Sequence, residues 1–319
     1  MTHLYPMKLT PVAKTAIWGG ERLRRDWSKP SDLPVVAETW ELTVREKENN
    51  LIQNGAFRGE KLSDVIKKQG KTLLGTTAEG ERFPLLIKFI DANDRLSVQV
   101  HPDDTFASAV EGDQGKTEMW YIVDADEGAT ILLGLVPGAT VNDFANASAS
   151  GDPEPVLRRV EVKKGDCFFI PAGMPHAIGK GILVAEIQQN CDLTYRVYDY
   201  NRRDKEGKLR ELHVEKALQV TRPFTDAEVE QIRYARGKNE DGMLANCPYF
   251  AVKRVKITQK YTDLVTNEKF CALLFLSGEG EVTANGVSVP YKKGDSFFLP
   301  AGLGSYTVSG DGEVLTTTP

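Results

Sequence analysis

Residues Lys163–Gly181 read KKGDCFFIPAGMPHAIGKG, and residues Lys292–Gly310 read KKGDSFFLPAGLGSYTVSG. Aligned without a gap, the first eleven positions of the two stretches differ at only two places, both by mild substitutions. The stretches then diverge, and His176 of the first is aligned with Ser305 of the second. In each, a Gly-Asp turn precedes a short apolar strand and a Pro-Ala-Gly turn follows it. The repeat predicts one local structure built twice, with an imidazole in only one copy.

Short segments of the same character fill much of the chain. They are rich in β-branched and aromatic residues and are bounded by Gly, Pro, Asn and Asp, which is typical of a β-sandwich or a β-barrel. The segments that we expect to form strands are residues 38–44, 85–90, 96–101, 118–125, 129–136, 157–173, 182–189, 249–257, 269–302 and a short terminal strand. We therefore predict a mainly β fold.

Helices are expected at fewer places. Residues 61–70, 103–112 and 140–150 have helical spacing, and Thr140 or Asn142 is a suitable N-cap for the last of them. Residues 201–220 and 225–238 are charged and helical in period, and we interpret them as a helical connector. A second strand-rich block begins near Asp241 and contains an Asn285-Gly286 hairpin turn.

The composition excludes several classes of partner. The 319 residues include 40 Lys and Arg against 45 Asp and Glu, for a formal net charge of -5, with no dense basic run. We expect no nucleic-acid or membrane partner. The four cysteines are widely spaced and form no CxxC motif, and no segment resembles a signal peptide or a membrane span. These features favour a protein of the reducing cytoplasm.

Two of the four histidines lie among other ligand-type side chains. His3 lies near the N-terminus and His213 in the connector, and we interpret both as exposed or capping residues. Strand alternation in LSVQVHPDD (residues 96–104) places Ser97, Gln99 and His101 on one face. That face is either the solvent side of a half-exposed strand or part of a site.

Further ligands follow in the next strands. In GKTEMWYIV (residues 115–123), alternation places Lys116, Glu118 and Trp120 on one face, and a later strand begins at His176. Two imidazoles, a carboxylate and a carboxamide together suit a borderline divalent cation. A metal site is therefore a second interpretation of these polar faces.

The spacing G-x5-P-x-G-x2-H is met at Gly165, Pro171, Gly173 and His176. It resembles the second sequence motif of the cupin superfamily, whose domains are antiparallel jelly-roll barrels. The second copy satisfies the spacing except at Ser305. This resemblance implies two cupin-type barrels (a bicupin) with helical insertions and a helical connector. The expected division is a metal-binding catalytic domain over residues 1–240 and a degenerate cupin domain over residues 241–319.

Five segments narrow the resemblance to one family: IWGG (17–20), FPLLIKFIDANDRLSVQVHPDD (83–104), KTEMWYI (116–122), PHAIG (175–179) and CDLTYRVYDY (191–200). Together they resemble type I mannose-6-phosphate isomerase (phosphomannose isomerase), in its short bacterial form. The resemblance implies a zinc-dependent aldose-ketose isomerase that interconverts mannose 6-phosphate and fructose 6-phosphate.

The resemblance also implies roles for single residues. One Zn²⁺ per chain would be held by Gln99, His101, Glu118 and His176. Catalytic roles fall on Lys116, Glu186 and Arg196, and substrate contacts on Trp18 and Ser97. The implied partner is a small sugar phosphate, and we expect a monomer or a weak homodimer. The continuation VYDYNRRDKEG (197–207) departs from the longer enzymes, whose separate helical domain this chain lacks.

Alternatives stay open at this stage. Asp103 and Asp104 are other candidates for proton transfer, although either is also a suitable helix N-cap. Arg22, Arg24 and Arg25 lie either near the site mouth or on a solvated face. An iron dioxygenase of the cupin type would have a His-x-His pair where Gln99-Val100-His101 stands. The third interpretation is a sugar-binding bicupin that is not an enzyme. The presence of Lys116, Glu186 and Arg196 together disfavours this interpretation.

Overall fold

The computed structural model describes residues 4–76, 82–204, 206–234 and 242–319. His3 lies outside these ranges, as do residues 235–238 of the expected connector helix. The described strands form three sheets in which every pairing is antiparallel. The prediction of a mainly β fold is confirmed.

The first two sheets together form what we call the N-terminal sandwich. Its seven-stranded sheet has the order β14 (Arg233–Tyr234), β10 (Cys167–Ile170), β7 (Glu118–Ala125), β12 (Ile182–Gln189), β5 (Leu85–Ala92), β3 (Glu38–Leu42) and β2 (Val12–Lys14). Its five-stranded sheet has the order β13 (Tyr195–Tyr198), β6 (Val98–Val100), β11 (His176–Ile178), β8 (Thr130–Leu135) and β9 (Leu157–Glu161). The core between them includes Ile90, Trp120, Leu133 and Ile178.

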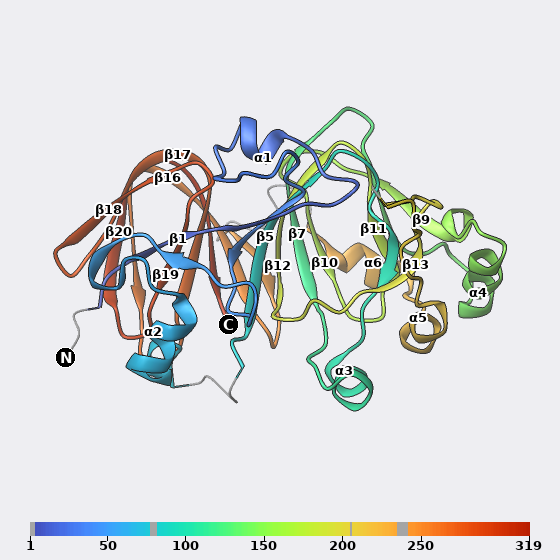
Figure 1. Cartoon of the computed structure of the whole chain (residues 1–319), viewed down its shortest axis with the longest axis horizontal. Coiled ribbons are helices and arrows are strands. Elements are labelled where there is room, and N and C mark those ends of the chain that lie inside the picture. The colour runs from blue at the N-terminus through green and yellow to red at the C-terminus, as the bar shows by residue number, and fades with distance from the viewer. Residues whose placement is uncertain (1–3, 77–81, 205, 235–241) are drawn as a thin grey trace.

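The third sheet, which we call the C-terminal sheet, has eight strands. Two of these eight are short strands from the first part of the chain. Its order is β15 (Met243–Asn246), β16 (Ala251–Val265), β20 (Gly304–Thr318), β17 (Cys271–Ala284), β19 (Ser296–Leu299), β1 (Met7–Thr10) and β4 (Leu51–Ile52), with β18 (Val287–Lys292) paired to β17. Figure 1 shows the blue β1 among these orange and red strands. The expected boundary at residue 240 stays a prediction, and strand pairing links the first residues of the chain to the last sheet.

The seven-stranded sheet is buried on both faces, which explains the apolar character of β5. Leu85, Ile87 and Phe89 pack toward the C-terminal sheet, in a core shared with residues such as Leu274 and Phe298. The alternate side chains point into the N-terminal sandwich, and among them is Lys88, which is only 4 % exposed. A cation therefore lies inside the sandwich, opposite the packed face of the same strand.

Of the helices in the described residues, α4 and α5 cover the outer face of the five-stranded sheet. The helices are α1 (Arg22–Arg25), α2 (Leu62–Gln69), α3 (Asp104–Glu111), α4 (Val141–Ala149), α5 (Val214–Val220) and α6 (Asp226–Ile232), with 3-10 turns at Gly55–Phe57, Lys71–Leu73 and Glu154–Val156. Phe144 of α4 and Ala217 of α5 pack with Val98 and Val100 of β6. In Figure 1, α4 and α5 lie at the end of the molecule farthest from the C-terminal sheet. Because β6 turns its valines to these helices, Gln99 faces the inside of the sandwich.

The expected N-caps are present in two helices. Asp103 accepts a hydrogen bond from the Phe106 amide at the start of α3. Thr140 and Asp143 form a reciprocal capping box at the start of α4. The structure differs in the connector, where helix begins only at Val214. In residues 201–213, Arg203 and Leu209 instead form an isolated β-bridge, and Arg202 and Arg210 bind Asp199.

The terminal strand was expected to be short, but β20 has 15 residues. Its segment VSGDGEV contains glycines that are typical of a loop. In the structure, β17 lies so close that a Cβ on Gly310 would be 2.2 Å from the carbonyl oxygen of Glu279. Glycine is therefore needed where β17 and β20 pack this closely. The glycines do not end the strand, and β20 continues through the segment.

The two copies of the repeat match up to the Pro-Ala-Gly turn and then differ. Gly165 and Gly294 both have a φ of 89°, which favours glycine. After the turn, Pro175 of the first copy is replaced by Gly304, whose φ is 82°. Proline cannot adopt this φ. Ser305 is exposed, in contrast to the buried His176, and the next residue, Tyr306, enters an aromatic core with Phe275, Tyr291 and Phe297.

None of the helices within the described ranges combines the length and the hydrophobicity that a membrane crossing requires.

Candidate metal centre and adjoining cavity

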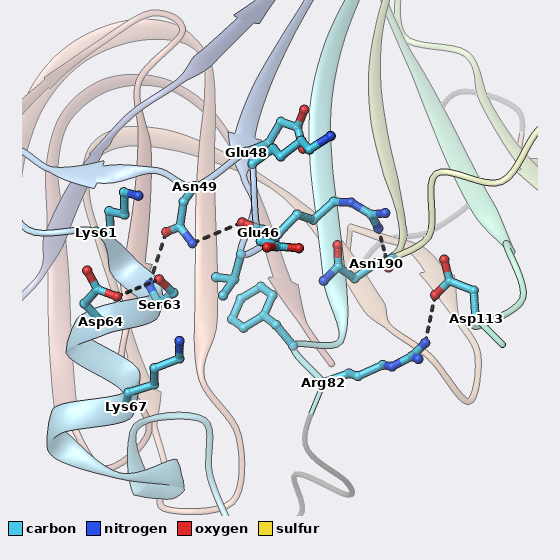
Figure 2. Close-up of a pocket in the computed structure, with 14 residues that line it drawn as sticks. Glu46, Glu48, Asn49, Lys61, Ser63, Asp64, Lys67, Arg82, Asp113 and Asn190 are labelled. Carbon is cyan, nitrogen blue, oxygen red and sulfur yellow. Dashed lines mark hydrogen bonds and ion pairs between the residues drawn. The ribbon is translucent and has the colours of Figure 1, made fainter.

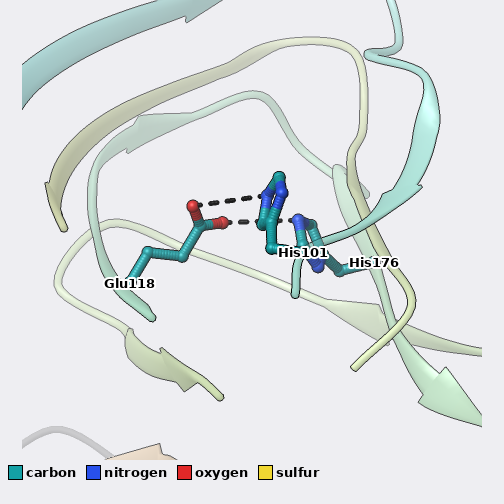
Figure 3. A group of neighbouring side chains, drawn as sticks. All are labelled: His101, Glu118 and His176. Atoms are coloured by element: carbon teal, nitrogen blue, oxygen red, sulfur yellow. Dashed lines mark ion pairs between the residues drawn. The ribbon is translucent and has the colours of Figure 1, made fainter. Parts of the chain in front are cut away.

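Three ligand-type side chains meet inside the N-terminal sandwich. His101, Glu118 and His176 are each at most 1 % exposed, and one ligand atom from each lies within 4.8 Å of the others. Nε2 of His176 is 3.3 Å from Oε1 of Glu118, and Nε2 of His101 is 3.6 Å from Oε2. Figure 3 shows both rings directed at the carboxylate. These three residues form a candidate metal centre.

Strand register brings the ligands together. On the five-stranded sheet, His176 of β11 lies opposite Gln99 of β6, and Gln99 lies opposite Arg196 of β13. Cross-strand neighbours of this kind share a face of the sheet. Glu118 comes from the facing sheet, at the start of β7. The centre is thus built between the two sheets of the sandwich.

A hydrogen bond orients one of the two imidazoles as a ligand, and burial keeps both neutral. Nδ1 of His176 donates to the backbone oxygen of Met174 at 2.8 Å, so Nε2 keeps its lone pair toward the centre. The Gln99 carboxamide is 3.3 Å from that Nε2, and half a turn of the amide would direct its oxygen there. Burial lowers the pKa of His176 to about 4 and that of His101 well below its usual range. Both rings are therefore neutral at pH 7, as metal binding requires.

The donor atoms of the centre lack ordinary partners. Within the described residues, both carboxylate oxygens of Glu118 and Nε2 of His101 are buried without a hydrogen bond. Burial raises the pKa of Glu118, with Glu186 adding repulsion, whereas Lys116, whose Nζ is 3.3 Å from Oε2, opposes the rise. A buried carboxylate facing two neutral imidazole nitrogens leaves a space that suits a cation.

A second row of polar residues crosses the seven-stranded sheet. Glu186 of β12 lies opposite both Trp120 of β7 and Lys88 of β5. Trp120 Nε1 donates to Glu186 Oε2 at 3.0 Å, and Lys88 Nζ is 3.3 Å from Oε1. Burial opposes ionisation of Glu186, but Lys88 and Lys116 outweigh it and lower its pKa. Burial likewise opposes the charge of Lys88, and Glu186 and Glu38 outweigh it and raise its pKa. Both members of this pair are charged.

A cavity of about 340 Å³ adjoins the metal centre and opens to solvent. Its volume is within the usual range of roughly 300–1,000 Å³ for small-molecule sites. The lining residues are Trp18, Glu38, Lys88, Ile90, Leu96, Ser97, Gln99, Lys116, Ile178, Glu186, Asp192, Thr194, Arg196, Arg210 and His213.

The structure therefore brings all nine sequence-predicted site residues into one region. Six of them line the cavity directly: Trp18, Ser97, Gln99, Lys116, Glu186 and Arg196. The other three form the metal centre, which adjoins the cavity wall. Gln99 in that wall contacts His176, and Lys116 contacts Glu118. The structure shows only that these residues lie close together, and their roles as ligands, catalysts and substrate contacts stay proposals.

Some candidates lie elsewhere. Asp103 caps α3, and Asp104 accepts from the Gly115 amide and the Gln189 side chain. Arg22 binds the fully buried carboxylate of Asp91, with Nε 2.8 Å from Oδ1. Neither these residues nor Arg24 and Arg25 line the cavity.

Sequence reasoning missed five ionisable residues of the cavity wall. Lys88 was detectable as a lone charge in the apolar run LLIKFI (residues 85–90). His213 was interpreted as exposed or capping, and it does occupy the N-cap position of α5, but its side chain also lines the cavity. No sequence signal indicated the positions of Glu38, Asp192 and Arg210, which depend on strand register and loop folding.

A larger hollow of about 810 Å³ lies away from this chemistry. Figure 2 shows its lining, which comes mainly from the segment around Glu46 and Glu48 and from α2. Arg82 in its wall binds Asp113, and the lining includes none of the sequence-predicted site residues. Size alone therefore does not identify the functional cavity.

The comparisons with known proteins agree with one another. Residues 7–142 match the family model for the catalytic domain of type I phosphomannose isomerase, and residues 240–319 match the model for the mannose-6-phosphate isomerase cupin domain. The chain is 38 % identical over 316 residues to mannose-6-phosphate isomerase ManA of Bacillus subtilis (strain 168), with 98 % of each covered. It is 34 % identical over 312 residues to the mannose-6-phosphate isomerase of Streptococcus mutans, again with 98 % of each covered.

Solved structures extend this likeness. The crystal structure of the Bacillus subtilis mannose 6-phosphate isomerase superposes with a TM-score of 0.88 at 34 % identity, covering 98 % of this chain and 99 % of that one. A phosphomannose isomerase from Salmonella typhimurium superposes with a TM-score of 0.78 at 16 % identity, covering 98 % of this chain and 99 % of that one, which shows a shared fold.

Proposed function

The chain belongs to the type I phosphomannose isomerase family, and from this premise we propose that it interconverts mannose 6-phosphate and fructose 6-phosphate. The observation that supports this most directly is the convergence of His101, Glu118 and His176 beside a cavity lined by Lys116, Glu186 and Arg196. An isomerase of this kind needs a base, a stabiliser for developing negative charge and a means of holding the phosphate. The cavity offers side chains of each type.

We propose zinc as the metal, at one ion per chain. His101, Glu118 and His176 would hold it, with Gln99 as the fourth protein ligand. Two neutral imidazoles and a carboxylate suit a catalytic zinc that keeps a position open. When bound, such an ion polarises a substrate oxygen as a Lewis acid. It would also give a ligand bond to the Glu118 oxygens, which have no hydrogen bond among the described residues, and keep that carboxylate ionised.

The proposed proton carrier is Glu186. An aldose-ketose isomerisation moves a proton between C1 and C2 through an enediol. Because Lys88 and Lys116 lower the pKa of Glu186, its carboxylate is ionised at neutral pH and can accept a proton. Trp120 holds Oε2, so the orientation of the carboxylate is fixed before substrate enters. A buried and oriented carboxylate of this kind is suited to general base catalysis.

Two cationic side chains and two uncharged side chains complete the proposed site. Lys116 is 4 % exposed and would stabilise negative charge that develops on a substrate oxygen. Arg196 has no carboxylate within ion-pair distance among the described side chains, so its charge is available to an anionic substrate. Trp18 and Ser97, both at most 5 % exposed, would shape and bind the sugar end of the cavity.

The cellular setting is a further proposal. The four cysteines are free, with Cys167, Cys191 and Cys271 buried. The free thiols fit a reducing compartment, and we propose the cytoplasm.

A coupled assay tests the proposed function. The purified, zinc-loaded chain is given mannose 6-phosphate, and fructose 6-phosphate is followed as it forms. Steady turnover is expected. Absence of turnover by folded, metal-loaded protein would contradict the proposal, and oxygen consumption with iron and sugar-binding screens would then examine the other cupin activities.

A further inference from the structure

The cationic charge of the cavity is not evenly balanced along its length. In the buried part, Lys88 faces Glu186 and Glu38, and Lys116 faces Glu118. Asp192 also acts on this part, where it helps to raise the pKa of Lys88. These groups are therefore largely neutralised by their neighbours. The excess of positive charge lies in another part of the lining.

That part is the partly exposed end formed by Arg196, Arg210 and His213. The side chains of Arg210 and His213 are 24 % and 27 % exposed, whereas those of Lys88 and Lys116 are at most 5 % exposed. Arg202 and Arg210 form ion pairs with one buried carboxylate, Asp199, which also favours the charged form of Arg196 from a longer distance. Arg202 also pairs with Asp94 at 3.4 Å and does not line the cavity, so Arg196 and Arg210 against Asp199 leave a surplus of positive charge that a phosphate group would offset. Glu211 is nearby, but its side chain is 83 % exposed and its charge is screened by water.

Arg196 also has an unused donor at this end. Its Nη1 donates to the backbone oxygen of Glu211 at 2.9 Å. Its Nε is buried and has no hydrogen-bond partner in the described parts of the chain. Burial, with the nearby Arg210 second, lowers the pKa of Arg196, so the charge of this guanidinium is held at some cost. A buried, unpartnered donor on a cation indicates a missing anion.

Arg210 is brought to the cavity by the segment after β13. The chain turns back on itself there, with Arg203 and Leu209 bridged. Arg202 and Arg210 on the two limbs both bind Asp199, which is 5 % exposed. Asp199 takes the Nε and Nη2 edge of Arg210, and the Nη1 end is left for a second anion.

His213 supplies the third donor. Its amide donates to the Arg196 backbone oxygen at 2.7 Å, and its Nδ1 accepts from the Arg196 amide at 3.3 Å. Because Nδ1 is the acceptor, the neutral ring carries its proton on Nε2. The two backbone contacts fix the ring beside Arg196, in the cavity wall.

We propose that Arg196, Arg210 and His213 bind the phosphate dianion of the sugar phosphate, and that Asp199 is a positioning residue which holds Arg210 in place. This inference rests on the proposed function for the identity of the sugar, but the anion site itself can be measured separately. The sugar carbons then extend from this end of the cavity toward Lys116 and the metal centre.

The test measures phosphate binding and turnover on the same variants. Inorganic phosphate is titrated calorimetrically into the zinc-loaded wild type, Arg210→Ala and Arg203→Ala. Arg203 is a matched control because it lies on the same turn but is exposed and does not line the cavity. Loss of a charge-assisted contact should weaken phosphate binding about tenfold or more in Arg210→Ala and leave Arg203→Ala unchanged. KM for mannose 6-phosphate should rise in parallel, with a smaller change in kcat.

A double-mutant cycle tests the role of Asp199. Asp199→Asn should weaken phosphate binding when Arg210 is present and add little in the Arg210→Ala background. A merely structural role would give the same loss in both backgrounds. If Arg210→Ala is not folded by circular dichroism, His213→Gln is measured in its place, with the same weakening expected.

The outcomes separate the two proposals. A folded Arg210→Ala variant with wild-type phosphate affinity and KM, made from an active enzyme, would overturn the inference and leave the proposed function standing. A wild type that binds phosphate through Arg210 but does not turn over mannose 6-phosphate would support the anion site and contradict the proposed function.

Discussion

Glu186 and Lys88 lie directly opposite each other on β12 and β5, with Oε1 of Glu186 3.3 Å from Nζ of Lys88. Both side chains are almost fully buried, and each stabilises the charged form of the other. The pair connects the strand register of the sandwich to the proposed chemistry, because a base at this depth must be kept ionised.

Lys88→Met should therefore impair the base without touching the metal ligands. Without Lys88, only Lys116 and the Trp120 hydrogen bond oppose the effect of burial, so the pKa of Glu186 should rise and less of its carboxylate is ionised at neutral pH. We expect kcat to fall by about 100-fold at neutral pH, and the acidic limb of the kcat profile to move to higher pH. Glu186→Gln should lose activity to a similar degree but show no such limb. An unchanged profile in Lys88→Met would argue against Glu186 as the base.

A buried ion pair at the junction of the sheets should contribute strongly to stability. Lys29 Nζ is 2.6 Å from Glu41 Oε1, both side chains are at most 4 % exposed, and Lys29 also donates to the Gly294 backbone oxygen. Lys29→Met leaves a buried carboxylate without its partner and should cost about 3–5 kcal/mol in the free energy of unfolding. The double variant with Glu41→Leu should recover much of that loss in urea unfolding. A loss in the double variant equal to the sum of the losses in Lys29→Met and Glu41→Leu would mean that the pair is not coupled.

The ion pairs of Asp199 with Arg202 and Arg210, which we call the Asp199 cluster, predict that the free energy of unfolding depends on pH. Burial acts to raise the pKa of Asp199, but Arg210 and Arg202 outweigh it and lower the value. A carboxylate with a lowered native pKa adds stability above its unfolded pKa, and this is lost as the pH falls through the native pKa. The difference in unfolding free energy between wild type and Asp199→Asn should thus be largest at about pH 7 and smaller at about pH 3. A constant difference across this range would show that the charge of Asp199 does not contribute.

Restoring a histidine to the second copy of the repeat should not create a second metal site. Ser305 is exposed on β20, and the interior beside it is filled by Tyr306, Tyr291 and Phe275. Ser305→His should therefore place its ring in solvent. Elemental analysis after dialysis against zinc should give the same metal content as the wild type. A second equivalent of zinc in the variant would show that the interior rearranges.

Three of the candidate metal ligands, Gln99, His101 and His176, could be predicted because they follow local patterns in the sequence. Alternation on residues 96–101 placed Gln99 and His101 together, and the repeat singled out His176. Lys88, Arg210 and His213 were missed for a different reason. Lys88 faces Glu186 through pairing between strands far apart in sequence, and Arg210 reaches the cavity through the Asp199 cluster, which no local period encodes.

Two parts of the fold were predicted wrongly: the length of the terminal strand and the first part of the connector. The terminal strand was expected to be short, but β20 continues through Gly310 and Gly312, where the glycines allow β17 and β20 to come close. In the connector, the charged residues 201–213 had helical spacing, and ion pairs to Asp199 hold them in a turn instead. Both outcomes depend on tertiary contacts, which override local pattern.

The most direct test of the central claim is isomerase activity measured together with metal content, before chelation, after chelation and after zinc is returned, on the wild type and His176→Ala. The account predicts that the wild type holds one zinc per chain, loses conversion of mannose 6-phosphate with the metal and regains both, whereas folded His176→Ala retains little of either. Full activity in metal-free wild type, or in His176→Ala without bound zinc, would contradict the account.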